Sequence, residues 1–246
     1  MASWILGAVV AGLVVVWAVW GARPFVRSLN VRGLLEPGYS AMETGYGRRP
    51  DGTMVVSALT RMPGVKAAMV RWWFCDYMQS TEHYVMWHPA DHVWMDWADK
   101  RPGQIVGASH LVRERIGGEL DKLRIAFFDP AEMFGMDPNS EAMFVLCAKP
   151  GPLDAWLRVG QMCHVVRDTP WGAEMRSRFW LGHVESVDEN ALKRLATNIV
   201  GNTNLARRLL VKKSKAAGLL QHCLEEMGNL SDFLPALYRK HKGGPV

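Results

Sequence analysis

The longest uninterrupted apolar stretch of the chain lies near its N-terminus. Residues 4–20 contain no charge and no proline, and tryptophans stand near both ends of the run. A membrane-spanning helix needs about 17–25 apolar residues, and tryptophans are enriched at the membrane interfaces. A cleaved signal peptide is the alternative, but no basic residue precedes the run and it is long for a signal-peptide core. The pattern predicts a transmembrane anchor over residues 1–27.

Basic residues follow this run and none precedes it. Arg23, Arg27 and Arg32 all lie on its C-terminal side. Because positively charged flanks stay in the cytoplasm, the asymmetry predicts a single-pass membrane protein whose remaining chain is on the cytoplasmic side. The four cysteines form no CxxC pair, which agrees with free thiols in a reducing compartment. The alternative is an exported domain whose cysteines are merely buried.

The middle of the chain changes from loop-like composition to alternating strands. Residues 28–60 are rich in glycine, proline and charge, which predicts linker and loops with one short strand over 54–59. The aromatic stretch 70–97 predicts short helices that are broken at Pro89. Beyond it, apolar segments separated by Pro, Gly and Asp predict five strands, over residues 104–115, 122–128, 142–147, 156–167 and 175–187.

Helical periodicity returns at the C-terminus. A helix is predicted over 189–200, with Asp188 as its N-cap, and a longer one over 214–240. Six residues of the longer helix recur at steps of three or four and share one face: Leu219, His222, Glu226, Leu230, Phe233 and Leu237. Helices, then antiparallel strands, then a long helix predict an α+β domain over residues 61–242, whose sheet curls around the last helix.

Composition and charge narrow the classes of function. A length of 246 residues suits one domain with a short extra segment, and 49% hydrophobic residues exclude a disordered chain. No internal repeat is present, which excludes solenoids and propellers. The net charge of +5 fits an anionic membrane surface at least as well as nucleic acid, and no nucleic-acid partner is expected.

Two polar residues interrupt the apolar face of the last helix. His222 and Glu226 are four positions apart, so both side chains reach the same place, as two ligands of one metal ion must. A buried carboxylate is costly unless it is paired or bound to a metal. The alternative is a histidine–carboxylate hydrogen bond within the core.

A second cluster of polar residues lies within the aromatic stretch. Pro89 can open a helix with His88 at its cap, which could bring His88 near His92. The nearby tryptophans Trp87, Trp94 and Trp97 would give an aromatic-walled cavity for a small molecule. The alternative is an aromatic core with histidines at its edge.

A glutamate on a predicted strand completes the candidate set. Alternation along the strand puts His110, Val112 and Glu114 on one face, so Glu114 is expected to point inward with the valine. The alternative is an exposed glutamate paired with a neighbouring arginine. Together the clusters offer two or three histidines and two carboxylates, a set that suits Zn²⁺ with an open position for water or substrate.

Four stretches, taken in order, resemble the 2,4-diacetylphloroglucinol hydrolase family, which includes phloretin hydrolase. They are residues 71–97, 107–127, 176–182 and 222–238, and the resemblance covers roughly residues 60–240. It implies a Bet v 1-like helix-grip fold and one zinc ion bound by two histidines and two glutamates. It also implies hydrolysis of a carbon–carbon bond between an aromatic ring and an acyl carbonyl.

The resemblance also implies roles for individual residues. The metal ligands would be His88, Glu114, His222 and Glu226, with His92 as a close rival of His88. Candidate catalytic residues are His92, Asp91 and His164. Phe179 and Trp180 would line the cavity, while Arg176 and Arg178 are either donors to ring oxygens or structural residues.

The N-terminal apolar run departs from the pattern of this family, whose members have no membrane anchor. An anchored enzyme could draw a hydrophobic or aromatic substrate from the bilayer. Two alternatives remain, a non-catalytic helix-grip module that binds a hydrophobic ligand and an accessory subunit of a membrane complex. A membrane-protein partner or a homo-oligomer would also fit.

Overall fold

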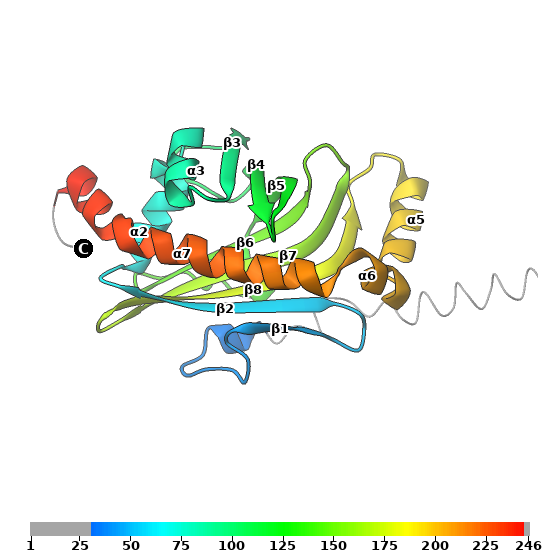
Figure 1. The fold of residues 1–246 in the computed structure, drawn as a ribbon, viewed down its shortest axis with the longest axis horizontal. Helices are drawn as coiled ribbons and strands as arrows, with labels where there is room; N and C mark the ends of the chain where they lie inside the picture. Colours follow the sequence, from blue (N-terminus) through cyan, green and yellow to red (C-terminus); the bar gives the residue numbers. More distant parts are fainter. Residues whose placement is uncertain (1–30, 244–246) are drawn as a thin grey trace, which may run out of the picture.

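The computed structural model describes residues 31–243, which build one antiparallel sheet wrapped around a long C-terminal helix (Figure 1). Within these residues the sheet has eight strands in the order β1-β2-β8-β7-β6-β5-β4-β3. The strands are β1 (Gly45–Arg48), β2 (Met54–Pro63), β3 (His92–Ala98), β4 (Ser109–Ile116), β5 (Glu119–Phe128), β6 (Met143–Pro152), β7 (Leu157–Thr169) and β8 (Gly172–Ser186).

Helices fill the inner face of this sheet and its two ends. The long helix α7 (Lys213–Lys242) crosses the inner face, with α2, η3 and α3 near its C-terminal end and α5 and α6 near its N-terminal end (Figure 1). The shorter helices are η2 (Arg32–Leu34), α2 (Ala67–Trp72), the π-helix η3 (Trp73–Tyr77), α3 (Thr81–Trp87), α4 (Pro130–Phe134), α5 (Ala191–Gly201) and α6 (Asn204–Leu210).

The main core lies between α7 and the sheet. Met227, Leu230 and Leu234 of α7 are fully buried against strand residues such as Val56 and Met175. Burial of this apolar face against the curved sheet is what holds the helix in place. The predicted α+β helix-grip arrangement is therefore confirmed for the described residues.

The predicted transmembrane anchor, residues 1–27, lies outside the described residues. Among residues 31–243, no helix is both long and apolar enough to cross a bilayer. All four cysteines are buried free thiols, as their spacing indicated.

The segment expected to be linker and loops takes part in the fold. It contains β1 and most of β2, and β2 pairs with β8 over ten residues. Residues 31–43 cover the outer face of β8, where the Glu43 carboxylate accepts hydrogen bonds from the buried guanidinium groups of Arg176 and Arg178. Such long-range ion pairs leave no periodic signal in the sequence.

The aromatic stretch is only partly helical. The helices predicted before Pro89 form, but the helix expected after it does not, because His92–Ala98 is the edge strand β3 paired with β4. His92 and Met95 are its buried residues, three positions apart rather than two, because a β-bulge between His92 and Trp94 shifts the register. Pro89 lies in the turn after α3, and His88 is the C-cap of that helix. At α5 the N-cap is Asn190 rather than Asp188, since the Asn190 side chain accepts from two backbone amides.

Candidate functional site

Four side chains from three elements converge on the inner face of the sheet. The Nε2 atom of His222 lies 3.8 Å from Oε2 of Glu226 and 3.8 Å from Oε2 of Glu114. The Nε2 atom of His92 lies 3.6 Å from Oε2 of Glu226 and 3.9 Å from Oε2 of Glu114. All four residues are buried. Two imidazole nitrogens and two carboxylate oxygens therefore face one another in a buried cluster.

Regular secondary structure explains this convergence. In α7 the four-residue spacing stacks His222 and Glu226 on the face that packs toward the sheet. In β4 the alternation of burial sends His110, Val112 and Glu114 inward, as the sequence predicted. His92 begins β3, directly opposite Glu114 in the register of β3 and β4. The neighbouring strand thus places an imidazole beside the carboxylate.

Contacts with Tyr84 fix the orientation of the His92 side chain. Its Nδ1 lies 2.9 Å from the carbonyl oxygen of Tyr84, which can only accept, so Nδ1 carries the proton. The ring also stacks on the Tyr84 ring, with centroids 3.7 Å apart. Nε2 is buried and has no hydrogen-bond partner within the described residues. Its lone pair is therefore free for an electrophile.

The His222 side chain is oriented in a similar way, but its Nδ1 is held by a carboxylate instead of a carbonyl. Its Nδ1 donates to Oδ2 of Asp91 at 3.0 Å, which leaves Nε2 facing the two glutamates. Burial lowers the pKa of His222, but Glu226, Glu114 and Asp91 together raise it above its ordinary value. A carboxylate behind a histidine fixes its tautomer and makes it a stronger metal ligand. Asp91, predicted as catalytic, lies behind the cluster in this position.

The two glutamates are also held by neighbouring groups. Burial alone would raise the pKa of Glu226, but His92 and His222 outweigh it, so the pKa lies below the ordinary value. Glu114 accepts a short hydrogen bond from the Tyr84 hydroxyl. Burial and the Glu114 charge raise the pKa of Tyr84 well above 10, which keeps its proton on the hydroxyl. Because its pKa is lowered, Glu226 is an anion at neutral pH.

His88 lies beside this cluster rather than in it. Its Nε2 is 3.6 Å from Oδ2 of Asp91 and 3.5 Å from Oε2 of Glu225, on the side of His222 away from Glu114. Burial, followed by the nearby His222 and His92, lowers its pKa. The structure thus groups two sets of residues that could hold a metal ion, one of His92, His222 and Glu226 and one of His88, Asp91 and His222.

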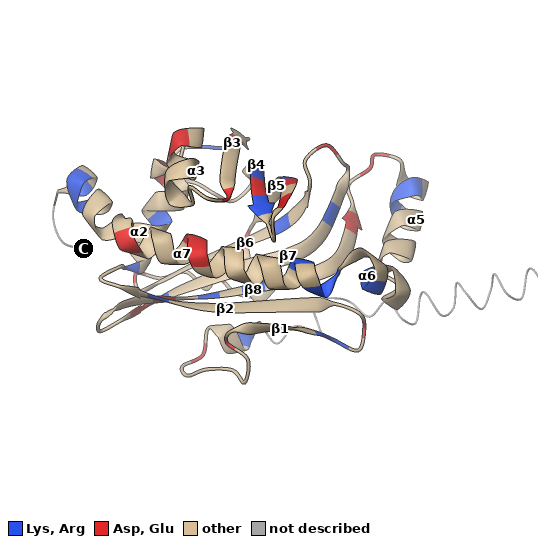
Figure 2. Ribbon diagram, in the orientation of Figure 1, with Lys and Arg blue, Asp and Glu red and all other residues tan. Residues whose placement is uncertain are grey.

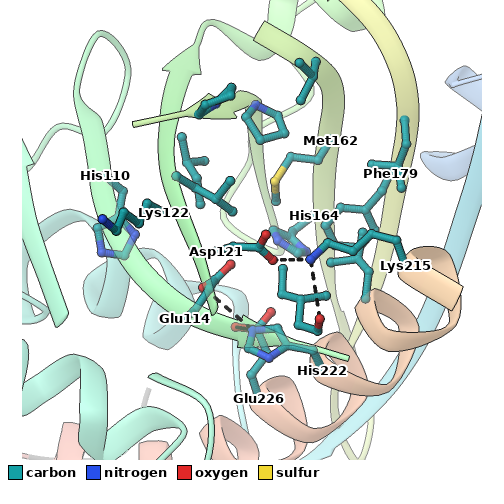
Figure 3. Close-up of a pocket in the computed structure, with 18 of the residues that line it drawn as sticks. His110, Glu114, Asp121, Lys122, Met162, His164, Phe179, Lys215, His222 and Glu226 are labelled. Carbon is teal, nitrogen blue, oxygen red and sulfur yellow. Dashed lines mark hydrogen bonds and ion pairs between the residues drawn. The ribbon is translucent and has the colours of Figure 1, made fainter. Parts of the chain in front are cut away.

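A cavity of about 430 Å³ extends from the cluster along the inner face (Figure 3). Glu114, His222 and Glu226 line one part of it, and most of the remaining wall is apolar. The apolar wall includes Phe74, Trp87, Leu123, Ile125, Phe127, Leu146, Met162, Phe179, Leu181, Val184 and Leu219. An apolar cavity with a few convergent polar groups is typical of a small-molecule site.

His164 and Phe179 line this cavity, as predicted. His164 is fully buried, and burial lowers its pKa to about 4, so it is neutral near pH 7. Its Nδ1 is 2.7 Å from Oγ of Ser177, which leaves Nε2 as the nitrogen available to a ligand. Trp180 was wrongly placed on the cavity wall, because it points to the outer face and packs with Val31 and Leu34. Arg176 and Arg178 share that outer face and are structural.

Two features of the site were not predicted. Tyr84 lies on the buried side of α3 and touches both His92 and Glu114, although its one-turn spacing from Trp87 and His88 could have indicated a shared face. Lys215 forms an ion pair with Asp121 at the cavity wall, across 94 positions of sequence (Figure 3). No local pattern connects these two residues.

One known protein family matches most of the chain. Residues 26–239 match the protein family described as "DAPG hydrolase PhiG domain". The chain belongs to this family. It is 26% identical over 234 residues to a 2,4-diacetylphloroglucinol hydrolase of Pseudomonas protegens, covering 86% of this chain and 72% of that protein. It is 27% identical over 214 residues to the phloretin hydrolase of Eubacterium ramulus, covering 80% and 72%.

Solved structures show lower similarity. Ara h 8.0201 matches with a TM-score of 0.45 and 8% identity, over 75% of this chain and 99% of that chain. The KanY protein matches with a TM-score of 0.44 and 11% identity, over 76% and 98%.

Proposed function

We propose that this protein is a zinc-dependent hydrolase that cleaves the carbon–carbon bond between an aromatic ring and an acyl carbonyl. The observation that carries the proposal is the convergence of two buried imidazole nitrogens and two buried carboxylates beside an apolar cavity. Membership of the family, whose relatives include 2,4-diacetylphloroglucinol and phloretin hydrolases, supports the reaction class.

The residues fit a zinc ion. Nitrogen and carboxylate oxygen are ligands that zinc accepts, and the buried Nε2 of His92 has no other partner in residues 31–243. The proposed ligands are His92, Glu114, His222 and Glu226. His88 is not among them, because its Nε2 faces Asp91 and Glu225 instead. When bound, zinc supplies the Lewis acidity that polarises an acyl carbonyl.

The protein's own residues would handle protons and orientation. Hydrolysis adds water to the acyl carbon, breaks its bond to the ring, and returns a proton to the ring carbon. Neutral His164, with Nε2 available at the cavity wall, can accept the proton of the water or hydrogen-bond a ring oxygen. Tyr84 retains its proton and holds Glu114 in place. The apolar wall excludes bulk water from the ring carbon as charge develops on it.

Anchoring of the protein to a membrane is part of the proposal. The uncharged run over residues 4–20 and the basic residues that follow it support a single-pass anchor with the domain on the cytoplasmic side. A hydrophobic aromatic ketone would then be available from the bilayer. Epitope accessibility in sealed vesicles tests this orientation.

Elemental analysis of the purified full chain tests the metal site. We expect about one zinc per chain in the parent protein, little in His92→Ala and Glu226→Ala, and an unchanged content in His88→Ala. The matched control is His241→Ala, since His241 is exposed near the end of α7. Loss of zinc from His88→Ala but not from His92→Ala would refute the ligand assignment.

A substrate assay on the same proteins tests the reaction. The parent should cleave 2,4-diacetylphloroglucinol or phloretin, and His92→Ala should not, while His164→Ala should keep zinc but lose most of the turnover. A folded parent protein with neither zinc nor turnover would refute the hydrolase proposal. That result would favour a module that only binds a hydrophobic ligand, which the apolar cavity could also accommodate.

A further inference from the structure

One end of the molecule exposes an apolar surface that the rest of the domain does not cover. We define the α5–α6 patch as the exposed large hydrophobic residues of this end: Trp156, Val187, Leu192, Leu195, Val200, Leu205, Leu209 and Leu210. Leu192 is 79% exposed, Leu195 is 58% exposed and Leu209 is 70% exposed. Trp156 and Val187 lie next to each other, since the Val187 amide donates to the carbonyl of Trp156.

The apolar residues of α5 have the spacing of a buried face. Leu192, Leu195, Ala196 and Ile199 recur at steps of three and four, which normally turns such a stripe toward a core. In the structure α5 and its C-cap instead contact β8 through Asn198, Asn202 and Gly201, the last of which packs on Val184. Asn198 accepts from the Ser186 amide, and Asn202 bonds both polar groups of the Val184 backbone. No residue of α5 is buried within the described structure: Leu192, Leu195 and Ala196 are exposed, and Ile199 is half-buried.

Charges around the patch are mostly basic. Between residues 187 and 213 the exposed charged residues are Lys193, Arg194, Arg208, Lys212 and Lys213, against only the acidic Asp188 and Glu189 in the same segment. Figure 2 shows blue segments on α5, on α6 and at the start of α7. Exposed leucines beside lysine and arginine are the pattern of helices that lie in the interface of an anionic bilayer.

The sequence before the described residues also favours a membrane as the surface that covers this patch. The uncharged run ends at Trp20, and only the ten residues from Gly21 to Asn30 separate it from Val31, the first residue of the described domain. At most about 3.6 Å per residue, this distance keeps the domain within roughly 40 Å of the membrane in which the run is proposed to lie. A membrane surface is therefore within reach of the domain at all times.

The α5–α6 patch also borders the cavity. Leu210 belongs to the patch, is largely exposed, and lines the cavity together with its neighbour Val211. Val184, Lys215 and Asp121 line the same part of the cavity. The cavity wall thus extends to the exposed leucines at the N-terminal end of α7. This is the opposite end of α7 from α2 and α3 (Figure 1).

We infer that the α5–α6 patch docks in the interface of an anionic lipid bilayer, so that the mouth of the cavity opens onto the membrane. A hydrophobic substrate then passes from the bilayer to the cavity without crossing water. The docking stands on the exposed leucines and their basic neighbours, while its use for substrate entry rests on the proposed function. The two can fail separately.

Site-directed fluorescence on the full chain tests the docking. Leu195→Cys and Leu209→Cys would each be labelled with an environment-sensitive fluorophore, and the native cysteines, all buried, give the background in the parent chain. Trp171→Cys is the matched control, because Trp171 is exposed at the β7–β8 turn, at the far end of β8 from α5. The proteins are reconstituted into phosphatidylcholine vesicles with and without phosphatidylglycerol.

In the anionic vesicles, labels at 195 and 209 should be quenched by spin-labelled lipid and protected from iodide, whereas the label at 171 should behave in the opposite way. Without phosphatidylglycerol the lipid quenching should fall several-fold. Iodide quenching at 195 and 209 as strong as at 171 would overturn the inference. Protection from iodide without lipid quenching would also overturn it, because the chain's own N-terminal segment or a second copy would then cover the patch.

A double variant separates docking from chemistry. Leu195→Glu with Leu209→Glu should lower turnover of a vesicle-dissolved acylphloroglucinol several-fold and leave turnover of a short-chain, water-dissolved one unchanged. Trp171→Glu should change neither. Equal turnover of the dissolved and vesicle-borne substrates by the double variant would overturn the entry route. If the parent cleaves neither substrate, the proposed reaction fails, while the labelling result still decides the docking.

Discussion

Gly117 and Gly218 are in contact and set the distance between α7 and the strand that carries Glu114. Gly117 and Gly118 form the turn between β4 and β5, both with positive φ, and Gly218 of α7 packs on that turn. A Cβ atom added at Gly218 would lie 2.6 Å from Cα of Gly117 and 2.7 Å from its backbone nitrogen. Gly218→Ala therefore tests whether this close approach positions the site.

The magnitude follows from the contact distances. To restore an ordinary carbon–carbon separation, α7 and the turn must move apart by about 1 Å. Alanine gains about 1 kcal/mol of helix propensity over glycine, while overpacking costs about 1–3 kcal/mol, so the variant should range from unchanged to about 2 kcal/mol less stable. His222 lies one turn beyond Gly218, and Glu114 lies three residues before Gly117. Metal affinity should therefore fall about tenfold or more.

Gly228→Ala is the matched control, because it is in the same helix and nothing lies within 4 Å of its Cβ position. This variant should be up to about 1 kcal/mol more stable and should bind zinc as the parent does. Urea unfolding followed by tryptophan fluorescence gives the stabilities, and competition with a chromophoric chelator gives the affinities. Equal stability and equal zinc affinity of the two variants would show that the glycine contact does not position the site.

Three further predictions concern single side chains. Asp91→Asn removes the negative charge behind His222 and should weaken zinc binding about 10- to 100-fold without unfolding the chain; an unchanged dissociation constant would contradict it. Glu43→Gln leaves two buried guanidinium groups without their carboxylate and should lower the free energy of unfolding by about 3 kcal/mol or more, whereas the exposed Glu119→Gln should change it little. Burial lowers the pKa of His110 to about 3. As pH falls below about 6.5, this histidine is therefore protonated in the unfolded chain before it is protonated in the folded one. The stability that neutral His110 provides is lost as pH falls from about 6.5 toward 3. In the metal-free protein His110→Phe should flatten this loss by up to about 1.4 kcal/mol per pH unit, and parallel pH profiles would refute the assignment.

Periodicity predicted the parts of the site that lie on regular elements. The three- and four-residue steps in α7 correctly joined buried His222 and Glu226 to buried Leu230. Alternation in β4 likewise predicted that Glu114 points inward. In both cases the side-chain direction follows from backbone geometry alone.

Irregular and long-range features could not be predicted in this way. Between His88 and His92 the chain passes through a turn at Pro89, so spacing cannot show which imidazole faces the glutamates. The choice depends on the Tyr84 carbonyl, which holds Nδ1 of His92, and on the pairing of β3 with β4. Arg176 and Arg178 resembled site residues, but their partner Glu43 lies more than 130 positions away.

The strand β8 has two faces that serve different parts of the molecule. Ser177 and Phe179 point inward, toward His164 and the cavity, while Arg176 and Arg178 point outward and are held by residues 33–43. Adjacent residues of one strand move together. The segment 31–43 on the outer face and the cavity wall on the inner face are therefore both coupled to β8. A displacement of residues 31–43 would therefore reach the cavity side of the sheet through neighbouring residues of β8. Natural selection that keeps Arg176 and Arg178 would then also preserve the shape of a cavity that these two side chains do not contact.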